Sequence, residues 1–113
     1  MAGHARDPGA AGGRAFVCVA SGFYEGLVWP LDRPSTVIGR GRSADLVLNE
    51  ATISRAHALF GMERARPFVQ DLGSTNGTLV NGERAERRLL DDGDELRMGR
   101  LVLRIRIEAA ARV

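Results

Sequence analysis

One stretch near the end of the chain limits the fold more than any other, because its apolar residues recur at every second position. The apolar series is Leu101, Leu103, Ile105 and Ile107, and the intervening residues are Val102, Arg104 and Arg106. A period of two residues is that of a β-strand with one buried face. No segment carries an apolar stripe at helical spacing over three turns. The chain is therefore predicted to fold from strands.

Short apolar runs, separated by turn-forming residues, occupy most of the remaining chain. The runs are residues 16–20, 26–31, 35–38, 45–48, 56–60, 68–70 and 78–80. Asn-Gly pairs, which favour tight hairpin turns, stand at 76–77 and 81–82. Residues 83–90 fit either one helical turn or the start of a strand. Many short strands joined by frequent turns predict an all-β fold, an antiparallel sandwich or barrel.

The length of the chain, 113 residues, is enough for one domain with a core of its own. Residues 1–14 contain four glycines, a proline and no large apolar residue after Met1, so we expect a disordered N-terminal lead. The folded domain is predicted to span residues 15–108. Residues 109–113 are predicted to form a short C-terminal tail.

The basic residues are sixteen arginines and no lysine, which gives a net charge of +2 and a pI of about 9.5. The positive excess lies at the two ends of the chain, because residues 15–108 hold thirteen arginines and thirteen acidic residues. A neutral body argues against nucleic-acid binding, which depends on clustered positive charge. We therefore expect no nucleic-acid partner.

Nothing in the sequence predicts secretion or insertion into a membrane. No apolar stretch approaches the roughly 18 residues of a spanning helix. The N-terminus lacks the apolar segment of a signal peptide, and a single cysteine, Cys18, excludes an internal disulfide. We expect a cytoplasmic protein with no membrane insertion.

Three sequence patterns are typical of functional sites, but each of them is better explained by a structural role. Residues 39–44 match the glycine pattern of a dinucleotide-binding loop, but a strand follows instead of the helix that such a loop requires. The acidic run at 91–95 lacks the spaced ligands of a calcium loop. His57 has no cysteine or second histidine nearby in sequence. We predict no enzyme activity, no metal site and no cofactor.

Four short polar motifs remain, each at a position where a loop is expected. They are Gly39-Arg40, Ser54-Arg55 followed by His57, Gly-Ser-Thr-Asn-Gly-Thr at 73–78, and Asn81-Gly82. In this order and spacing they resemble the motifs of the forkhead-associated (FHA) domain family, of the small bacterial single-domain type. The likeness is specific over residues 37–82, and the flanking strands extend it over most of the chain.

The resemblance implies a β-sandwich of about eleven short strands, with loops at one end that bind phosphothreonine peptides. The side chains suit that role on their own chemistry. Arg40 presents a fork of donors to two phosphate oxygens, Ser54 adds a hydroxyl donor, and Arg55 adds a second cation. Thr75 provides a further donor, and Asn76 carries both a donor and an acceptor for the peptide backbone.

Two further groups of residues surround this predicted site. The candidates for selecting the residue three positions after the phosphothreonine are Arg42, Ser43, Asn49 and Thr52. Structural support of the loops is assigned to Gly39, His57, Asp71, Gly77, Asn81 and Gly82. Within that second group, the glycines and the asparagine are expected at positions where the backbone needs a positive φ.

The sequence thus predicts a phosphothreonine reader that recruits a partner phosphorylated by a Ser/Thr protein kinase, in signalling or secretion. The alternative is a phospho-independent assembly module that uses the same β-sandwich. Exposed aromatic side chains at Phe23, Tyr24 or Trp29 would favour the alternative.

Overall fold

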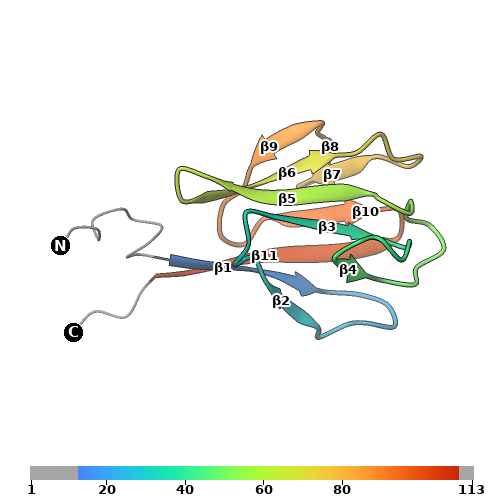
Figure 1. Cartoon of the computed structure of the whole chain (residues 1–113), viewed down its shortest axis with the longest axis horizontal. Helices are drawn as coiled ribbons and strands as arrows, with labels where there is room; N and C mark the ends of the chain where they lie inside the picture. Colours follow the sequence, from blue (N-terminus) through green and yellow to red (C-terminus); the bar gives the residue numbers. More distant parts are fainter. Residues whose placement is uncertain (1–12, 110–113) are drawn as a thin grey trace.

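Two β-sheets packed face to face form the folded part of the chain (Figure 1). The structure is a computed structural model that describes residues 13–109. Most of the predicted N-terminal lead and C-terminal tail, residues 1–12 and 110–113, lies outside the described residues. The first strand begins at Gly13 and the last ends at Ala109, so pairing starts slightly before the predicted domain boundary and ends slightly after it.

Eleven strands make up the two sheets, which confirms the predicted all-β sandwich. They are β1 (Gly13–Val19), β2 (Val28–Pro30), β3 (Ser35–Gly39), β4 (Leu46–Val47), β5 (Ala58–Glu63), β6 (Arg66–Asp71), β7 (Thr78–Val80), β8 (Glu83–Arg84), β9 (Arg87–Leu89), β10 (Glu95–Met98) and β11 (Leu101–Ala109). The segment 83–90, which the sequence left open between helix and strand, forms β8 and β9.

The two sheets differ in strand order, and one of them contains a parallel pair. The six-stranded sheet runs β2-β1-β11-β10-β7-β8, and the five-stranded sheet runs β4-β3-β5-β6-β9. All pairs are antiparallel except β3 and β4, where Ile38 lies opposite Leu46 in parallel register. The long central pair β1–β11 joins the two ends of the described part of the chain, with Gly13 opposite Ala109.

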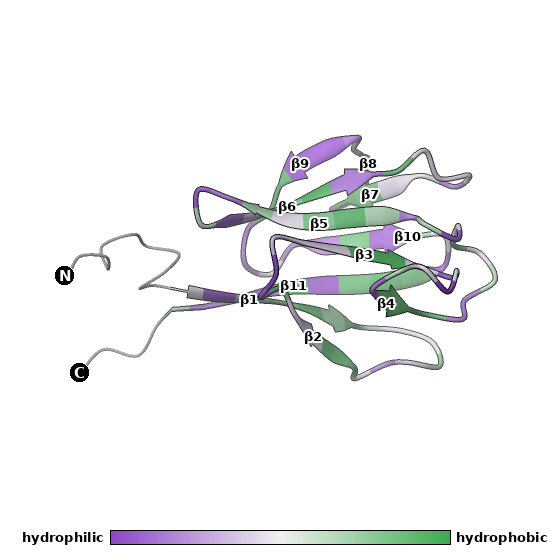
Figure 2. Ribbon diagram, in the orientation of Figure 1, coloured by the Kyte–Doolittle hydropathy of each residue, from purple (hydrophilic) through white to green (hydrophobic). Residues whose placement is uncertain are grey.

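The alternation along β11 places its apolar series in the core, as the sequence predicted. Leu101, Leu103 and Ile105 are buried between the sheets, while Arg104 and Arg106 face solvent. Figure 2 shows hydrophilic and hydrophobic bands alternating along β10 in the same way. Because each strand gives one face to the core, the other face of each sheet is free to carry polar residues.

The two ends of the sandwich have different contents. At one end β1 begins and β11 ends (Figure 1). At the opposite end lie three loops, 40–45 between β3 and β4, 48–57 between β4 and β5, and 72–77 between β6 and β7. The four polar motifs of the sequence fall mainly in these three loops, which we call the loop end.

Candidate functional site

The five residues predicted to bind a phosphopeptide come from all three loops of the loop end. Arg40 lies in the first loop, Ser54 and Arg55 in the second, and Thr75 and Asn76 in the third. The first two loops are joined through their backbones. The Arg40 N–H donates to the Ser54 carbonyl at 3.0 Å, and the Gly41 N–H donates to the Arg55 carbonyl at 3.0 Å. The fold thus brings together residues that are up to 36 positions apart in sequence.

The guanidinium of Arg40 is held in place by only one of its nitrogens. Its Nε donates to the Ile53 carbonyl at 3.0 Å, which fixes the direction of the side chain while it remains exposed. Within residues 13–109, Arg40, Arg42 and Arg55 make no ion pair with an acidic residue. The terminal nitrogens of Arg40 are therefore available to an anion from solution.

Ser54 and Thr75 link the second loop to the third. The Thr75 N–H donates to the Ser54 hydroxyl oxygen at 3.0 Å. A hydroxyl that accepts a hydrogen bond still has its own O–H to donate. Ser54 is therefore positioned by Thr75 and can present a donor to the same anion as Arg40.

His57 holds the second and third loops together from within the core. Its side chain is fully buried; the Ser54 N–H donates to its Nδ1 at 3.0 Å, and its Nε2 lies 2.9 Å from the Gly77 carbonyl. Because Nδ1 accepts a hydrogen bond, the ring hydrogen must be on Nε2, which then donates to Gly77. His57 thus contacts the backbone of both the second and the third loop.

Asp71 organises the turn of the third loop. Its carboxylate accepts hydrogen bonds from the Ser74 N–H at 3.0 Å, the Ser74 hydroxyl at 2.6 Å and the Thr78 hydroxyl at 2.7 Å. Burial raises the pKa of Asp71, but hydrogen bonds from Ser74 and Thr78, together with the nearby His57, outweigh burial and hold the pKa below its ordinary value. The Ser74 hydroxyl oxygen in turn accepts from the Gly77 N–H at 2.9 Å.

The glycines of the motifs are required for two different reasons. Gly77 has a φ of 82°, in the left-handed region that favours glycine, as expected. Gly39 does not have a positive φ, so that expectation is wrong for this residue. A Cβ at Gly39 would instead collide with the Arg55 carbonyl oxygen, because the two loop backbones touch at this point.

Asn81 and Gly82, which the sequence predicts to support the loops, lie outside the three loops of the loop end. They form the β7–β8 turn with φ values of 51° and 85°. The Asn81 side chain donates to Asp94 and accepts from the Glu95 N–H, both at 3.0 Å. This pair therefore joins the β7–β8 turn to the start of β10. The three residues of β7 separate it from the third loop.

The four candidate specificity residues differ in how far they are already engaged. Arg42 and Ser43 are exposed in the first loop, whereas the Asn49 N–H donates to the Tyr24 hydroxyl at 3.0 Å. Thr52 is the most engaged, because its carbonyl accepts from the Asn76 amide at 2.8 Å. The side chain of Asn76, which is predicted to hold the peptide backbone, is thus already oriented by the second loop.

Glu50 and Arg100 are two residues of the site that sequence reasoning missed. Glu50 accepts from the Thr52 hydroxyl at 2.7 Å and from the Thr52 N–H at 3.0 Å, and the Thr52 hydroxyl accepts from the Arg100 N–H at 2.8 Å. The pKa of Glu50 is lowered, mainly by the hydrogen bond from the Thr52 side chain and then by the one from the Thr52 backbone. Burial opposes this shift, and the charge of Arg100 adds to it. No sequence signal identifies Arg100, which lies 48 residues from Thr52.

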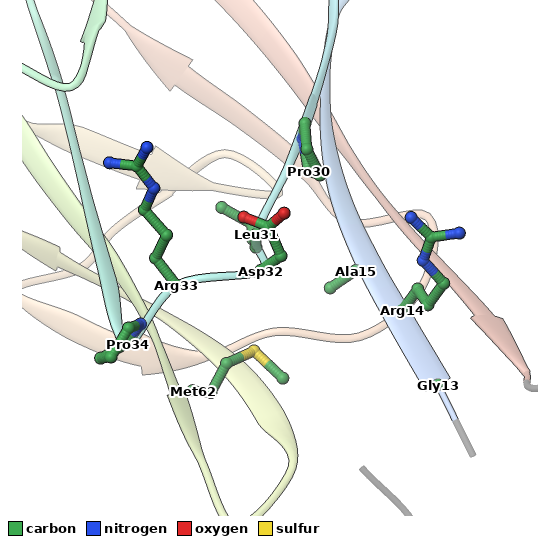
Figure 3. Close-up of a pocket in the computed structure, with 9 residues that line it drawn as sticks. All are labelled: Gly13, Arg14, Ala15, Pro30, Leu31, Asp32, Arg33, Pro34 and Met62. Atoms are coloured by element: carbon green, nitrogen blue, oxygen red, sulfur yellow. The ribbon is translucent and has the colours of Figure 1, made fainter. Parts of the chain in front are cut away.

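A cavity of about 430 Å³ lies at the other end of the sandwich (Figure 3). It is lined by Gly13, Arg14, Ala15, Pro30, Leu31, Asp32, Arg33, Pro34 and Met62. None of the residues predicted to bind a ligand lines it. A single phosphate needs convergent donors more than it needs volume, so we place the candidate site at the loop end.

The described residues give no indication of a metal centre or a membrane span. No group of three or more histidine, cysteine, aspartate or glutamate side chains within residues 13–109 is arranged to hold a metal ion. None of the elements in that same part of the chain is a helix long and apolar enough to cross a membrane.

The chain belongs to the FHA domain family. A model of the FHA domain matches residues 36–99, which is more than half of the chain. The match contains all three loops of the loop end and every residue predicted to bind the phosphopeptide.

Relatives from bacteria and a solved structure agree with this assignment. The chain is 37% identical over 109 residues to an oxoglutarate dehydrogenase inhibitor of Corynebacterium efficiens, covering 91% of this chain and 77% of the relative. It is 40% identical over 91 residues to the glycogen accumulation regulator GarA of Mycolicibacterium smegmatis, covering 80% of this chain and 58% of GarA.

The solved structure comes from a structural and functional study of phosphothreonine-dependent FHA domain interactions. It superposes with a TM-score of 0.76 at 31% sequence identity, covering 82% of this chain and 95% of the other. The likeness therefore includes nearly all of that solved chain, and it supports the two-sheet arrangement described above.

Proposed function

We propose that this chain is a non-catalytic module that binds phosphothreonine in a protein phosphorylated by a Ser/Thr kinase. The observation that carries the proposal is the exposed guanidinium of Arg40, fixed by Ile53, without an acidic partner in the described chain and next to the Ser54–Thr75 pair. A phosphothreonine carries a charge of about −1.5 to −2 and three acceptor oxygens. The site offers donors and positive charge to match both.

Each binding residue has a separate role in this proposal. Arg40 donates to the phosphate through its terminal nitrogens, and Ser54 donates its hydroxyl hydrogen. Arg55 adds positive charge from the neighbouring loop, and Thr75 completes the set of donors. Asn76, oriented by the Thr52 carbonyl, offers its amide oxygen to the peptide backbone and so fixes the register of the peptide.

A preference for threonine over serine requires contact with one additional methyl group. A methyl in an apolar pocket contributes about 1–3 kcal/mol, which corresponds to a factor of roughly 10 to 200. Selection of the residue three positions after the phosphothreonine is assigned to Arg42, Ser43, Asn49 and Thr52. Glu50, which is bound to Thr52, places a negative charge among them and disfavours an acidic residue at that position.

The wider role that we propose is regulation by recruitment. The two relatives are named as an inhibitor of a dehydrogenase and a regulator of glycogen accumulation. We propose that this chain likewise acts in the cytoplasm on phosphorylated protein partners, in a kinase-dependent signalling or secretion pathway, with no cofactor.

The test is a titration of a phosphothreonine peptide library, with phosphoserine and unmodified versions of each peptide as controls. We expect wild-type protein to bind the phosphothreonine peptides most tightly and the bare peptides least. Arg40→Ala removes a charge-assisted contact and should weaken binding by about 1.5–3 kcal/mol. Arg64→Ala is the matched control, because it removes an exposed arginine from the β5–β6 turn. Equal affinity for phosphorylated and bare peptides would reject the proposed function.

One observation favours the phospho-independent assembly module as a second candidate. Phe23 is 94% exposed in the β1–β2 connection and packs edge to face against Tyr24, with ring centroids 5.1 Å apart. Tyr24 and Trp29 are partly buried against the core, so they favour that alternative less. If assembly depends on this surface, Phe23→Ser will abolish the association that light scattering detects for unphosphorylated wild-type protein. If wild type and Phe23→Ser are both monomers, the assembly candidate is excluded.

A further inference from the structure

The outer side of the six-stranded sheet carries five arginines, which we call the arginine face. They are Arg14 on β1, Arg84 on β8, Arg97 on β10, and Arg104 and Arg106 on β11. The strand register places them on one side of the sheet, because residues directly opposite each other on neighbouring strands share a face. Only two acidic residues, Glu95 and Glu108, belong to the same side of these strands within the described chain.

Cross-strand rows bring the arginines together across four strands. Arg97 lies between Val102 and Leu79, and Leu79 lies opposite Arg84. In the next row, about 7 Å further along β11, Arg104 lies between Glu95 and Cys18. Residues 15–108 hold equal numbers of arginines and acidic residues, but these charges are unevenly distributed, because this face is positive.

The arginines of this face are also largely free of acidic partners. Within residues 13–109, only Arg106 of the five makes an ion pair, with Glu108 at 3.2 Å. On the outer side of the other sheet both arginines are paired, Arg66 with Asp91 at 2.7 Å and Arg87 with Glu63 at 2.6 Å. The two outer faces therefore differ in available charge as well as in the number of arginines.

Phe16 shows that part of the arginine face is held in a fixed arrangement. It points away from the core cluster, yet it is only 9% exposed. The guanidinium carbons of Arg14 and Arg106 lie 5.3 Å and 5.1 Å from the centre of its ring. Stacking on an aromatic ring limits the motion of an arginine, so less freedom is lost when it binds an acidic group.

The arginine face is continuous with the loop end. A Cβ at Gly77 would lie 2.9 Å from Cζ of Arg84, so this guanidinium covers the backbone that follows Asn76. On the other side, the Arg100 N–H donates to the Thr52 hydroxyl just before β11 begins. Arg84, a member of the arginine face, therefore borders the third loop, and Arg100 borders the second.

We propose that the arginine face is a second contact surface, which binds an acidic region of the same phosphorylated protein. The proposal rests on the proposed function, because the phosphothreonine supplies the first contact. A protein surface fits better than nucleic acid, since Glu95 and Glu108 and the half-buried Leu79 and Val102 interrupt the positive charge. The two contacts act together, so that each raises the effective concentration of the other.

The experiment compares one phosphothreonine peptide with the same peptide joined to an acidic segment. The short peptide is a binder from the titration above, and the acidic segment is about ten glutamates on a flexible linker of about six residues, attached at either end. The variants are Arg97→Gln/Arg104→Gln and, as the control, Arg66→Gln/Arg87→Gln on the opposite face. Both double variants lose two positive charges, so they are matched in net charge and differ in the face that they change.

We expect the acidic segment to tighten binding to wild-type protein by about tenfold at low ionic strength, and the gain to fall with added salt. Arg97→Gln/Arg104→Gln should lose most of the gain and retain its affinity for the short peptide. The control should retain both. No gain in wild type, or an equal gain in both double variants, overturns the arginine-face proposal and leaves the proposed function intact.

Two further outcomes are distinguishable from these. If wild-type protein binds none of the short phosphopeptides, the proposed function is wrong, and the arginine-face proposal is wrong with it. If a DNA duplex of about 20 base pairs binds wild type but not Arg97→Gln/Arg104→Gln, while the acidic segment gives no gain, the face binds nucleic acid and the proposal is wrong.

Discussion

The two ends of the sandwich offer different kinds of surface, a cavity at one end and fixed hydrogen-bond donors at the other. The end where β1 begins has a cavity of about 430 Å³, lined mostly by apolar residues such as Leu31 and Met62. The loop end presents Arg40 and Ser54 on neighbouring loops, which are joined by a hydrogen bond from the Arg40 N–H to the Ser54 carbonyl. Recognition of an anion depends on fixed donors, and these are found at the loop end.

The ends also differ in what holds them together. The loop end is joined by hydrogen bonds that run from Asp71 and His57 through Ser54 and Gly77 to the three loops. The cavity end depends on packing of residues such as Met62 against the core. Changes at the loop end should therefore affect binding and stability together, whereas changes at the cavity end should affect stability alone.

The largest expected effect is that of His57→Ala. Removing the ring leaves the Ser54 N–H and the Gly77 carbonyl without partners inside the protein, and it opens a cavity in the core. We expect a loss of about 3 kcal/mol in the free energy of unfolding, measured by chemical denaturation, and weaker phosphopeptide binding.

His57→Gln distinguishes the hydrogen bonds of this residue from its volume. Its amide can accept one hydrogen bond and donate another, so it should recover part of the lost stability. If His57→Ala loses less than about 1 kcal/mol, or binds the phosphopeptide as tightly as wild type, the two loops do not depend on the histidine.

The next largest effect is expected for Asp71→Asn. The amide replaces one acceptor oxygen with a donor facing the Ser74 N–H or hydroxyl, and stability should fall by about 1–2 kcal/mol at neutral pH. Because the folded-state pKa of Asp71 is lowered, its contribution is fully present above the ordinary aspartate pKa of about 4 and is lost as the pH falls through the lower folded value.

The measurement is the unfolding free energy of both proteins between about pH 3 and pH 7. The difference between them should be largest above about pH 5 and should shrink below about pH 4. A difference that stays constant over this range would show that the charge of Asp71 does not stabilise the third loop.

The smallest effect is expected at the cavity end. Met62 is half-buried and lines the cavity, so Met62→Ala should lower the free energy of unfolding by about 1 kcal/mol. Phosphopeptide affinity should equal that of wild type, since the residue lies at the opposite end from the loops. A loss of affinity at unchanged stability would remove the contrast between the two ends.

Sequence alone predicted the elements whose local pattern agrees with their final environment. The alternation at Leu101 to Ile107 specified β11 and its buried face, and the Asn-Gly pair at Asn81 specified the β7–β8 turn. The three-loop arrangement also followed, because the motifs that carry Arg40, Ser54 and Thr75 resemble those of a known family.

The remainder depends on contacts between distant parts of the chain. Arg84 and Arg100 reach the loop end only because β8 and the β10–β11 turn are placed there by strand pairing, and no motif marks them. Glu50 was missed because its partner Thr52 had been considered only for the ligand. Gly39 was attributed to a positive φ, since the approach of the Arg55 carbonyl cannot be read from sequence.

That approach of two backbones at Gly39 has a consequence for protein engineering. Arg40 and Arg55 are separated by a distance that main-chain hydrogen bonds set, and the exposed side chains at Arg42 and Ser43 take no part in it. The proposed phosphate site is therefore independent of the residues assigned to reading the peptide sequence. Libraries randomised at positions 42 and 43 should yield binders for different phosphothreonine sequences on one unchanged scaffold, provided that position 39 remains glycine.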